Sequence, residues 1–208
     1  MGVLLSSTLA SDYLAGVAST DTATTAILAR ALVRAESQVA VHLGYPGLSA
    51  TLESTSYTLR LRGSRIEPKR LLIPVAPVTA VASVYQDLDL AFGSGTLINS
   101  GDYEREDLRC GSYLNLLPTG QTSTWFTAER SIKVTCTAGY ADEAAMPTVL
   151  ADAIYRIVAD WWLRRTNRHL GSISAGGQNQ SVLDLKDANP DALAILEKFR
   201  ILGSVGIS

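Results

Sequence analysis

The side chains that most often bind metals or act as nucleophiles are few in this chain of 208 residues, and they stand apart from one another. Its two histidines, His42 and His169, have no cysteine, aspartate or glutamate nearby at metal-ligand spacing. The two cysteines, Cys110 and Cys136, form no ligand cluster, so we interpret them as structural thiols in a reducing compartment. We therefore expect neither a metal site nor a disulfide framework.

Other patterns that could support catalysis or phosphate binding have simpler interpretations. The glycine-rich runs GSGT (93–96) and AGGQNQ (175–180) lack the sequence context of a phosphate loop or a dinucleotide site, so we interpret them as turns. The segment DYEREDLR (102–109) interleaves both signs of charge, which favours a solvated loop over paired catalytic carboxylates. No nucleophile elbow is present, although a triad assembled in space stays open. We predict no catalytic residues and no cofactor.

Two segments remain as candidate interaction surfaces. The first is RLRGSRIEPKR (60–70), whose basic residues are Arg60, Arg62, Arg65, Lys69 and Arg70. We favour its interpretation as a charged hairpin edge that discourages strand pairing. A contact with an acidic partner surface or with passing DNA is the alternative.

The second segment is WWLRRTNRH (161–169), at the end of a long apolar-periodic stretch. Trp161 extends the apolar stripe of that stretch, whereas Trp162 lies about 100° further round a helix and can face another surface. Tryptophan and arginine are enriched among the residues that anchor protein interfaces, so Trp162, Arg164 and Arg165 are candidate partner contacts.

These segments are positioned by a predicted α+β fold. Apolar residues at helical spacing predict helices at 8–17, 21–43 and 147–168. Between them, alternation with a period of two predicts a β region at 56–140, which includes strands at 96–104 and 112–118 and a hairpin or loop at 87–95. Short strands with close turns favour an antiparallel sandwich or barrel-like sheet. We expect the helices from both ends to pack together, in a single domain of residues 1–169.

Residues 170–208 are predicted to form a flexible linker followed by a short amphipathic helix, because glycine, serine, asparagine and glutamine dominate the first part. The apolar residues Ile195, Leu196, Phe199 and Leu202 give the helix an adhesive face. Such a short helix is marginal alone in water and needs a groove. We expect no groove for it in its own fold, so that it is kept for a neighbouring molecule.

Composition bounds the classes of function. Hydrophobic residues make up 47% of the chain and charged residues 18%, with a formal net charge of -2. This balance argues against a general nucleic-acid binder and leaves surface available for subunit contacts. The N-terminus resembles neither a signal peptide nor a membrane anchor, so a soluble, cytoplasmic protein without a membrane partner is expected.

The order of motifs resembles the head–tail connector, or adaptor, family of tailed bacteriophages. An N-terminal helical pair ends in YPG (45–47), and PVTAVASV (77–84) is similar to the family's Pro-(Ile/Val)-x-x-Val-x-Ser-Val strand. Asp102-Tyr103 precedes the strand GSYLNL (111–116), and VTCTAGY (134–140) resembles a Val-Thr-Tyr-x-Ala-Gly-Tyr strand, with Cys136 in place of the tyrosine. MPTVLADAIYRIVADWWLRR (146–165) resembles the family's helix that starts at a proline. The likeness covers most of the chain through individually weak motifs.

The resemblance implies a non-enzymatic virion protein that forms a ring, typically dodecameric, beneath the portal. Such a ring extends the DNA channel, passes double-stranded DNA without reading its sequence, and contacts a stopper or other tail-proximal proteins. On this view the C-terminal helix and the end of the long helix reach the portal, and removal of residues 171–208 leaves a folded domain that does not dock. A stopper or tail-completion protein is the alternative, and a small β-sandwich binding module or enzyme is a further one.

Overall fold

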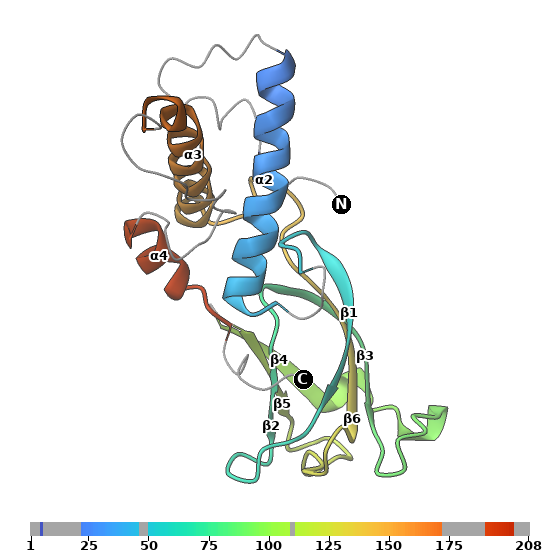
Figure 1. The fold of residues 1–208 in the computed structure, drawn as a ribbon. Helices are drawn as coiled ribbons and strands as arrows, with labels where there is room; N and C mark the ends of the chain where they lie inside the picture. Colours follow the sequence, from blue (N-terminus) through green and yellow to red (C-terminus); the bar gives the residue numbers. More distant parts are fainter. Residues whose placement is uncertain (1–4, 6–21, 46–49, 109–110, 172–189, 202–208) are drawn as a thin grey trace. The chain divides into compact units, whose positions relative to one another are not determined.

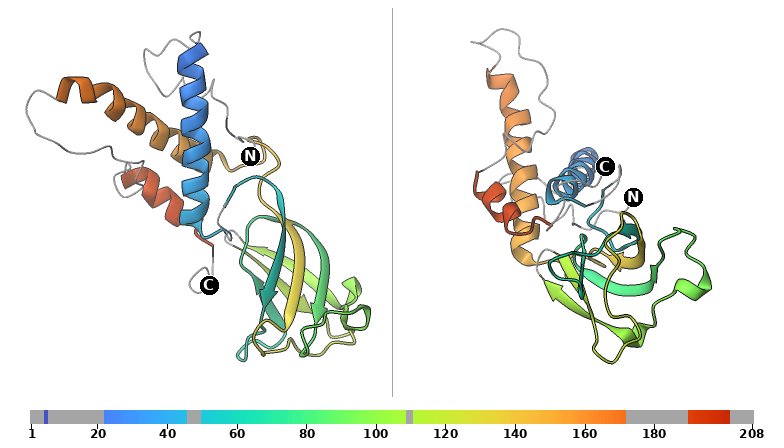
Figure 2. Two further views of the ribbon diagram at one scale, coloured as in Figure 1. Left: turned by 45° about the vertical axis from the view of Figure 1, so that its right-hand side comes forward. Right: turned by 90° about the horizontal axis from the view of Figure 1, so that it is seen from below.

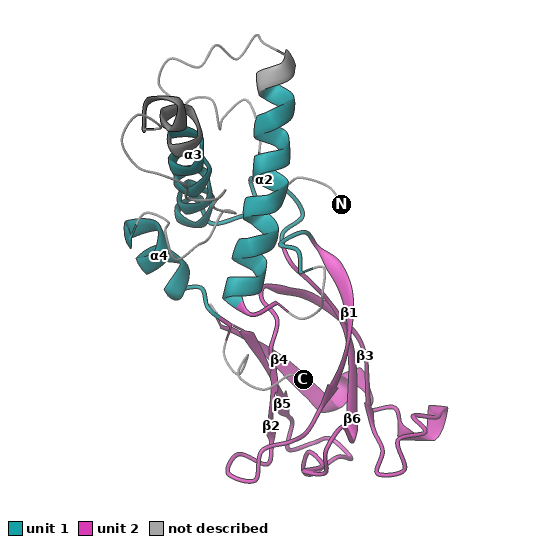
Figure 3. Cartoon of the chain, in the orientation of Figure 1, with its two compact units in different colours: residues 1–43, 47–53, 140–200 teal, residues 44–46, 54–139, 201–208 magenta. Residues whose placement is uncertain are grey.

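The computed structural model describes residues 5, 22–45, 50–108, 111–171 and 190–201, and the side chains of 25–163 within these ranges together with those of 5 and 190–201. The chain divides into two compact units, each considered by itself (Figure 3). A helical unit takes residues 1–43, 47–53 and 140–200, and a β unit takes 44–46, 54–139 and 201–208. The helix predicted at 8–17 lies outside the described residues. None of the described helices is long and apolar enough to cross a membrane.

Helix α2 (Thr22–Leu43) agrees with the helix predicted at 21–43. Its apolar positions at helical spacing, such as Leu28, Leu32 and Val39, are at most 2% exposed. Gly44 follows with φ of 90°, a left-handed conformation that an L-amino acid with a side chain adopts with strain. A glycine after the last apolar position therefore ends the helix where the sequence predicts.

Helix α3 (Thr148–Gly171) packs against α2, so the helices that precede and follow the β region pack together as expected. The carbonyl oxygen of Pro147 accepts hydrogen bonds from Leu150 N (2.8 Å) and Ala151 N (3.1 Å), which makes the proline the start of the first turn. Leu150 and Ile154 of its apolar stripe are fully buried. On the other side, Arg156 Nε lies 2.8 Å from Asp152 Oδ2, an exposed i,i+4 pair of the predicted kind.

Helix α4 (Pro190–Glu197) lies against α3 and α2 within the helical unit (Figures 1 and 2). Ala192 and Leu196, one helical turn apart, are both 0% exposed. The expectation that this helix has no groove in its own fold is therefore wrong. The small side chain of Ala192 permits close approach of the helices, and Leu196 fills the space one turn further on.

The β unit consists of two antiparallel three-stranded sheets with the orders β1-β6-β3 and β2-β5-β4. The strands are β1 (Thr55–Leu61), β2 (Arg70–Ile73), β3 (Val78–Gln86), β4 (Tyr103–Leu108), β5 (Gly111–Leu116) and β6 (Ile132–Ala138). Both sheets contribute to one core, for example through Val134 from β6 and Leu114 from β5. Trp125 closes this core at 1% exposure, and its Nε1 donates to the carbonyl oxygens of Lys69 (3.1 Å) and Leu114 (3.2 Å). The predicted α+β fold with a sandwich-like sheet is confirmed.

The region between β3 and β5 differs from prediction. Most of the strand predicted at 96–104 is replaced by two short 3-10 turns, η1 (Ser94–Thr96) and η2 (Ser100–Asp102), and only its residues 103 and 104 lie in a strand. The charged segment at 102–109, predicted to be a solvated loop, instead supplies β4, which pairs with β5 along its whole length. Backbone hydrogen bonds to a neighbouring strand are independent of side-chain polarity, so an edge strand can carry exposed charges.

Candidate interaction surfaces

Three side chains form a row across the outer face of the sheet β1-β6-β3. Arg60 pairs in register with Lys133, and Lys133 pairs with Tyr85. The ring of Phe92 lies on this row, with Arg60 Cζ 4.1 Å and Lys133 Nζ 5.2 Å from its centroid. Lys133 Nζ also lies 4.1 Å from the centroid of the Tyr85 ring. Arg60 is therefore engaged in cation–π packing within its own chain.

Arg70 is the centre of a second cluster, on the sheet β2-β5-β4. Its guanidinium lies 3.4 Å from Glu67 Oε1 and 3.0 Å from Glu106 Oε2, and its Cζ lies 4.1 Å from the centroid of the Tyr113 ring. Partial desolvation lowers the pKa of Arg70, but Glu67 and Glu106 outweigh it and raise the pKa above its usual value. The pKa of Glu106 is lowered, mostly by the hydrogen bond that Asn115 donates. Desolvation opposes this effect, and the charge of Arg70 and its hydrogen bond lower the pKa further.

The remaining basic residues divide into paired and unpaired. Arg62 forms an ion pair with Glu129. Within the part of the chain that the structure describes, Arg65 and Lys69 have no ion pair, and both are exposed. Of the five predicted contact residues, Arg60, Arg62 and Arg70 thus interact within the β unit. The flanking strands β1 and β2 are edge strands of two different sheets and form no hairpin with each other. A partner contact stays a prediction for Arg65 and Lys69.

A hollow of about 640 Å³, which we call the basic hollow, opens beside these residues. It is lined by Arg62–Glu67, Arg70, Leu72, Tyr113 and Thr127. Ile66 lies at this hollow with 92% of its surface exposed, which is unusual for a large aliphatic side chain. Cations without an ion pair among the described residues, next to an exposed aliphatic side chain, suit a protein partner better than a small ligand.

The end of α3 presents aromatic and apolar side chains. The rings of Trp161 and Trp162 meet edge to face, with centroids 6.4 Å apart and planes at 60°. Both are half-buried, and Leu163 is 54% exposed. The side chains of Arg164 and Arg165 lie outside the described residues.

The predicted contact residues of α4 do not share one environment. Leu196 is buried in the helical unit, whereas Ile195 and Phe199 are half-buried and keep surface for a partner. Leu202 lies outside the described residues. At the same contact, His42 Nε2 on α2 lies 3.2 Å from Glu197 Oε1, at ion-pair distance but without a well-aligned hydrogen bond.

One further surface, not predicted from the sequence, is the loop of residues 87–102 between β3 and β4, which we call the leucine loop. Leu88, Leu90 and Leu97 in this loop are 62%, 47% and 50% exposed. The signal available in the sequence is Asp-Leu-Asp-Leu at 87–90, a leucine repeat too short to be a core strand.

Candidate metal ligands are dispersed over the described residues. No group of three or more His, Cys, Asp or Glu side chains in that part of the chain is arranged to bind a metal ion. Cys136 is 0% exposed, and burial raises the pKa of its thiol to about 11. A thiol of this kind is protonated and shielded at neutral pH, which is the behaviour of a core residue.

Comparisons with known proteins now bear on the fold. No protein-family model and no curated protein sequence matches the chain. Among solved structures, a chain described as "Virion of native gene transfer agent (GTA) particle" matches 96% of this chain and 90% of its own length, at a TM-score of 0.58 and 18% identity. A chain of the "Neck of empty GTA particle computed with C6 symmetry" matches 97% of this chain and 93% of its own length, at a TM-score of 0.59 and 17% identity. A chain of the "Neck of native GTA particle computed with C12 symmetry" matches 97% of this chain and 93% of its own length, at a TM-score of 0.54 and 17% identity.

The fold is one found in the neck of a virus-like particle. The match includes residues of both units and nearly the whole of the neck chains, so it is not limited to a common β-sandwich.

Proposed function

We propose that the protein is a structural virion protein, a head–tail connector (adaptor) that forms a ring beneath the portal, extends the DNA channel and joins head to tail. The observation that carries this proposal is the likeness, from end to end, to chains of necks computed with C6 and C12 symmetry. The protein would act in the virion at the head–tail interface and in the host cytoplasm during assembly.

The surface chemistry supports a conduit better than a DNA-binding protein. Most of the basic residues in 60–70 are satisfied within the chain, and the net charge is -2. A channel wall that neutralised many phosphates would hold DNA in place, because each neutralised phosphate adds to affinity. A mildly acidic ring, dodecameric as the family resemblance implies, would let double-stranded DNA pass without sequence-specific binding.

Portal contact is assigned to the helical unit. Trp162, Leu163 and the predicted residues Arg164 and Arg165 would meet the portal at the end of α3, together with the exposed parts of Ile195 and Phe199 on α4. Leu196 would act indirectly, because it is buried and holds α4 in place. Leu202 remains a proposed contact from the sequence.

Electron microscopy of the protein mixed with its own portal tests the proposal. We expect a ring coaxial with the portal, and a Trp162→Ala variant that folds normally but binds the portal at least about tenfold more weakly, as for an interface anchor. Asp142→Asn, an exposed substitution in the loop before α3, serves as the control and should bind normally.

The stopper or tail-completion alternative makes a different prediction in the same experiment. Such a protein would leave the isolated portal bare and bind only after another neck component is added. If the protein binds neither the isolated portal nor the portal with an added neck component, the structural role is wrong. The β-sandwich binding module would then be the remaining alternative.

A further inference from the structure

The leucine loop and the basic hollow lie at the same end of the sheet β1-β6-β3, next to its two opposite edge strands. Leu61, the last residue of β1, and Gln86, the last of β3, both pair with Ile132, the first residue of the central strand β6. The segments that follow β1 and β3 therefore leave the sheet at one level, from its two different edges. Figures 1 and 2 show the two loops diverging from this end of the β unit.

The exposure of the leucines is a property of an ordered loop. The Asp87 carboxylate accepts hydrogen bonds from Asp89 N (2.9 Å) and Phe92 N (2.7 Å), and Ile98 N donates to Val84 O (2.8 Å). Phe92, only 7% exposed, fastens the loop to the row of Arg60 and Lys133 described above. The loop thus holds its leucines in solvent by a defined hydrogen-bond network.

Leu90 is also in a costly backbone conformation for a leucine. Its φ is 59°, in the left-handed region where glycine and asparagine are much better accommodated. Phe92 shares this feature with φ of 52°, but the burial of its ring offsets the strain. Leu90 is 47% exposed, so its side chain gains less from its own fold than that of Phe92.

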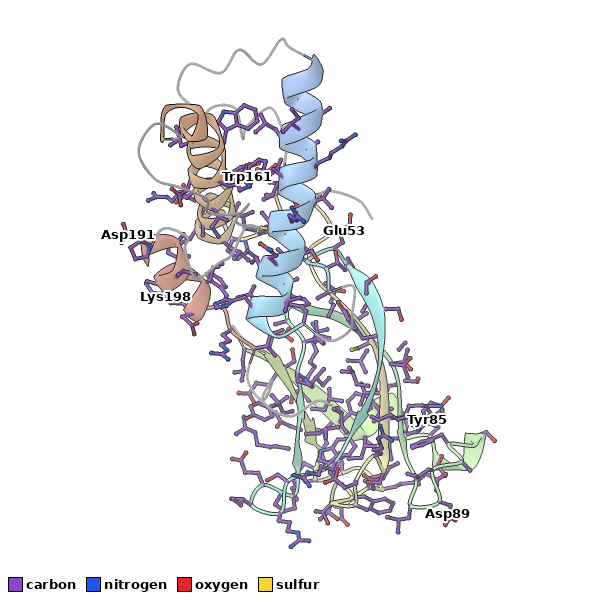
Figure 4. All side chains as sticks on the ribbon, viewed as in Figure 1. Glu53, Tyr85, Asp89, Trp161, Asp191 and Lys198 are labelled. Carbon is purple, nitrogen blue, oxygen red and sulfur yellow. The ribbon has the colours of Figure 1, made fainter. Side chains whose placement is uncertain are left out.

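The two surfaces are complementary in charge. Residues 87–102 contain three aspartates and no basic residue, whereas residues 62–70 contain four basic residues and one glutamate. The charged side chains without an ion pair among the described residues are also opposite in sign on the two surfaces. Arg65 and Lys69 have no ion pair within the described residues, and Asp89 lies at the outer end of the leucine loop (Figure 4), likewise without one there. Both surfaces carry exposed aliphatic side chains beside these charges.

We propose that the leucine loop of one copy of this chain packs against the basic hollow of the next copy, with Asp89 facing Arg65 and Lys69 and with Leu88 and Leu90 against Ile66. This inference rests on the proposed function, because a closed ring of more than two copies requires two different, complementary faces on each subunit. The position of both faces at one level of the β unit, on opposite edges, meets that requirement.

Cysteine pairing between copies tests the geometry. A chain with Ile66→Cys and Leu88→Cys, in a Cys110→Ser background, is assembled on its portal and mildly oxidised. We expect a ladder of covalent oligomers on a denaturing gel, since each copy would link to the next. Neither single substitution should give the ladder, nor should Ile66→Cys combined with Glu104→Cys on the edge strand β4.

Charge-reversal substitutions test whether Asp89 of one copy faces Arg65 and Lys69 of the next. Asp89→Lys alone, or Arg65→Glu with Lys69→Glu, should raise the protein concentration needed for half-maximal ring formation about tenfold, because like charges would then meet. The variant with all three substitutions should recover to within about twofold of wild type, since opposite charges meet again. Glu104→Lys is the matched control and should assemble normally.

The outcomes separate this inference from the proposed function. If wild-type protein forms no ring on the portal, the proposed function fails and the inference fails with it. If rings form but either the ladder or the charge rescue is absent, the leucine loop is not the subunit contact, while the connector role stands. The ladder and the rescue together support the inference.

Discussion

Several charged side chains of the β unit form cation–π contacts with aromatic rings of the same unit. Arg60 and Lys133 pack on Phe92, Arg70 packs on Tyr113, and the segment that looks most like a binding site in the sequence is largely engaged within the chain. Such contacts contribute about 0.5–1 kcal/mol each at exposed sites, so no single one decides stability. Three residues stand out as candidates for function. Arg65 and Lys69 have no ion pair within the described part of the chain, and Leu90 is exposed despite its strained backbone.

The strain at Leu90 leads to a prediction about stability. Leu90→Asn should leave the free energy of unfolding unchanged or raise it by up to about 1 kcal/mol, because asparagine tolerates the left-handed conformation. Urea unfolding followed by circular dichroism measures this change. Leu97→Asn, at an equally exposed site whose φ is negative, is the control and should give no gain. A loss above about 1 kcal/mol for Leu90→Asn would mean that the leucine serves the fold itself.

The thiol of Cys136 gives a second prediction at this scale. Because burial raises its pKa to about 11, the thiol is protonated at neutral pH and should react with a thiol reagent only when the β unit opens. In a Cys110→Ser chain, we expect the rate of labelling by dithionitrobenzoate at pH 8 to follow the unfolded fraction as urea is added. Rapid labelling of the native protein would contradict the burial of this residue.

At the scale of elements, short or charged segments owe their structure to their neighbours. Strand β4 carries Glu104, Arg105, Glu106 and Asp107 and exists as the edge partner of β5. Helix α4 has eight residues, too few for stability in water, and packs on α2 and α3 through Ala192 and Leu196. Both elements therefore depend on the completed fold around them.

The dependence of α4 on one side chain is testable. Leu196→Ala removes a fully buried leucine and should cost about 2–5 kcal/mol of unfolding free energy, or detach α4 if that is less costly. Ile195→Ala, at a half-buried position of the same helix, should cost less. Thermal unfolding measures the cost, and protection of α4 amides from hydrogen exchange shows whether the helix stays docked. Equal effects of the two substitutions would argue against the observed orientation of α4.

At the scale of the whole molecule, each unit has its own core, and the helical unit is assembled from both ends of the chain. Because α4 belongs to this unit, the C-terminal segment is part of a core as well as a candidate for partner binding. The surfaces proposed for portal contact and for contact between copies lie on different units: the helices for the first, and the loops of the β unit for the second.

Truncation separates these roles. Removal of residues 190–208 should lower the Tm by about 5 °C or more, because it uncovers apolar surface of α2 and α3, and it should weaken portal binding. Replacement of residues 172–189 by a Gly/Ser linker of equal length is the control and should keep the Tm. Differential scanning fluorimetry and portal pull-down provide the two measurements. An unchanged Tm after truncation would restore the view of α4 as a segment without a site in its own chain.

Periodicity alone determined the long elements of this protein. Helices α2 and α3 and strand β6 have apolar residues at a regular period over enough length that burial of one face requires one secondary structure, and Gly44 and Pro147 end or begin helices by backbone geometry. The α+β class and the pairing of helices from both chain ends follow from these elements, because each apolar face needs a partner.

Tertiary structure alone decided the elements and surfaces whose partners are distant in sequence. Strand β4 forms because it is hydrogen-bonded to β5, and α4 docks because α2 and α3 leave space for it. The cation–π contact of Arg60 requires Phe92, which is distant in sequence. The opposite placement of the leucine loop and the basic hollow depends on the order β1-β6-β3. Sequence patterns record which face of an element is apolar, whereas pairing and docking are set by which other elements arrive beside it.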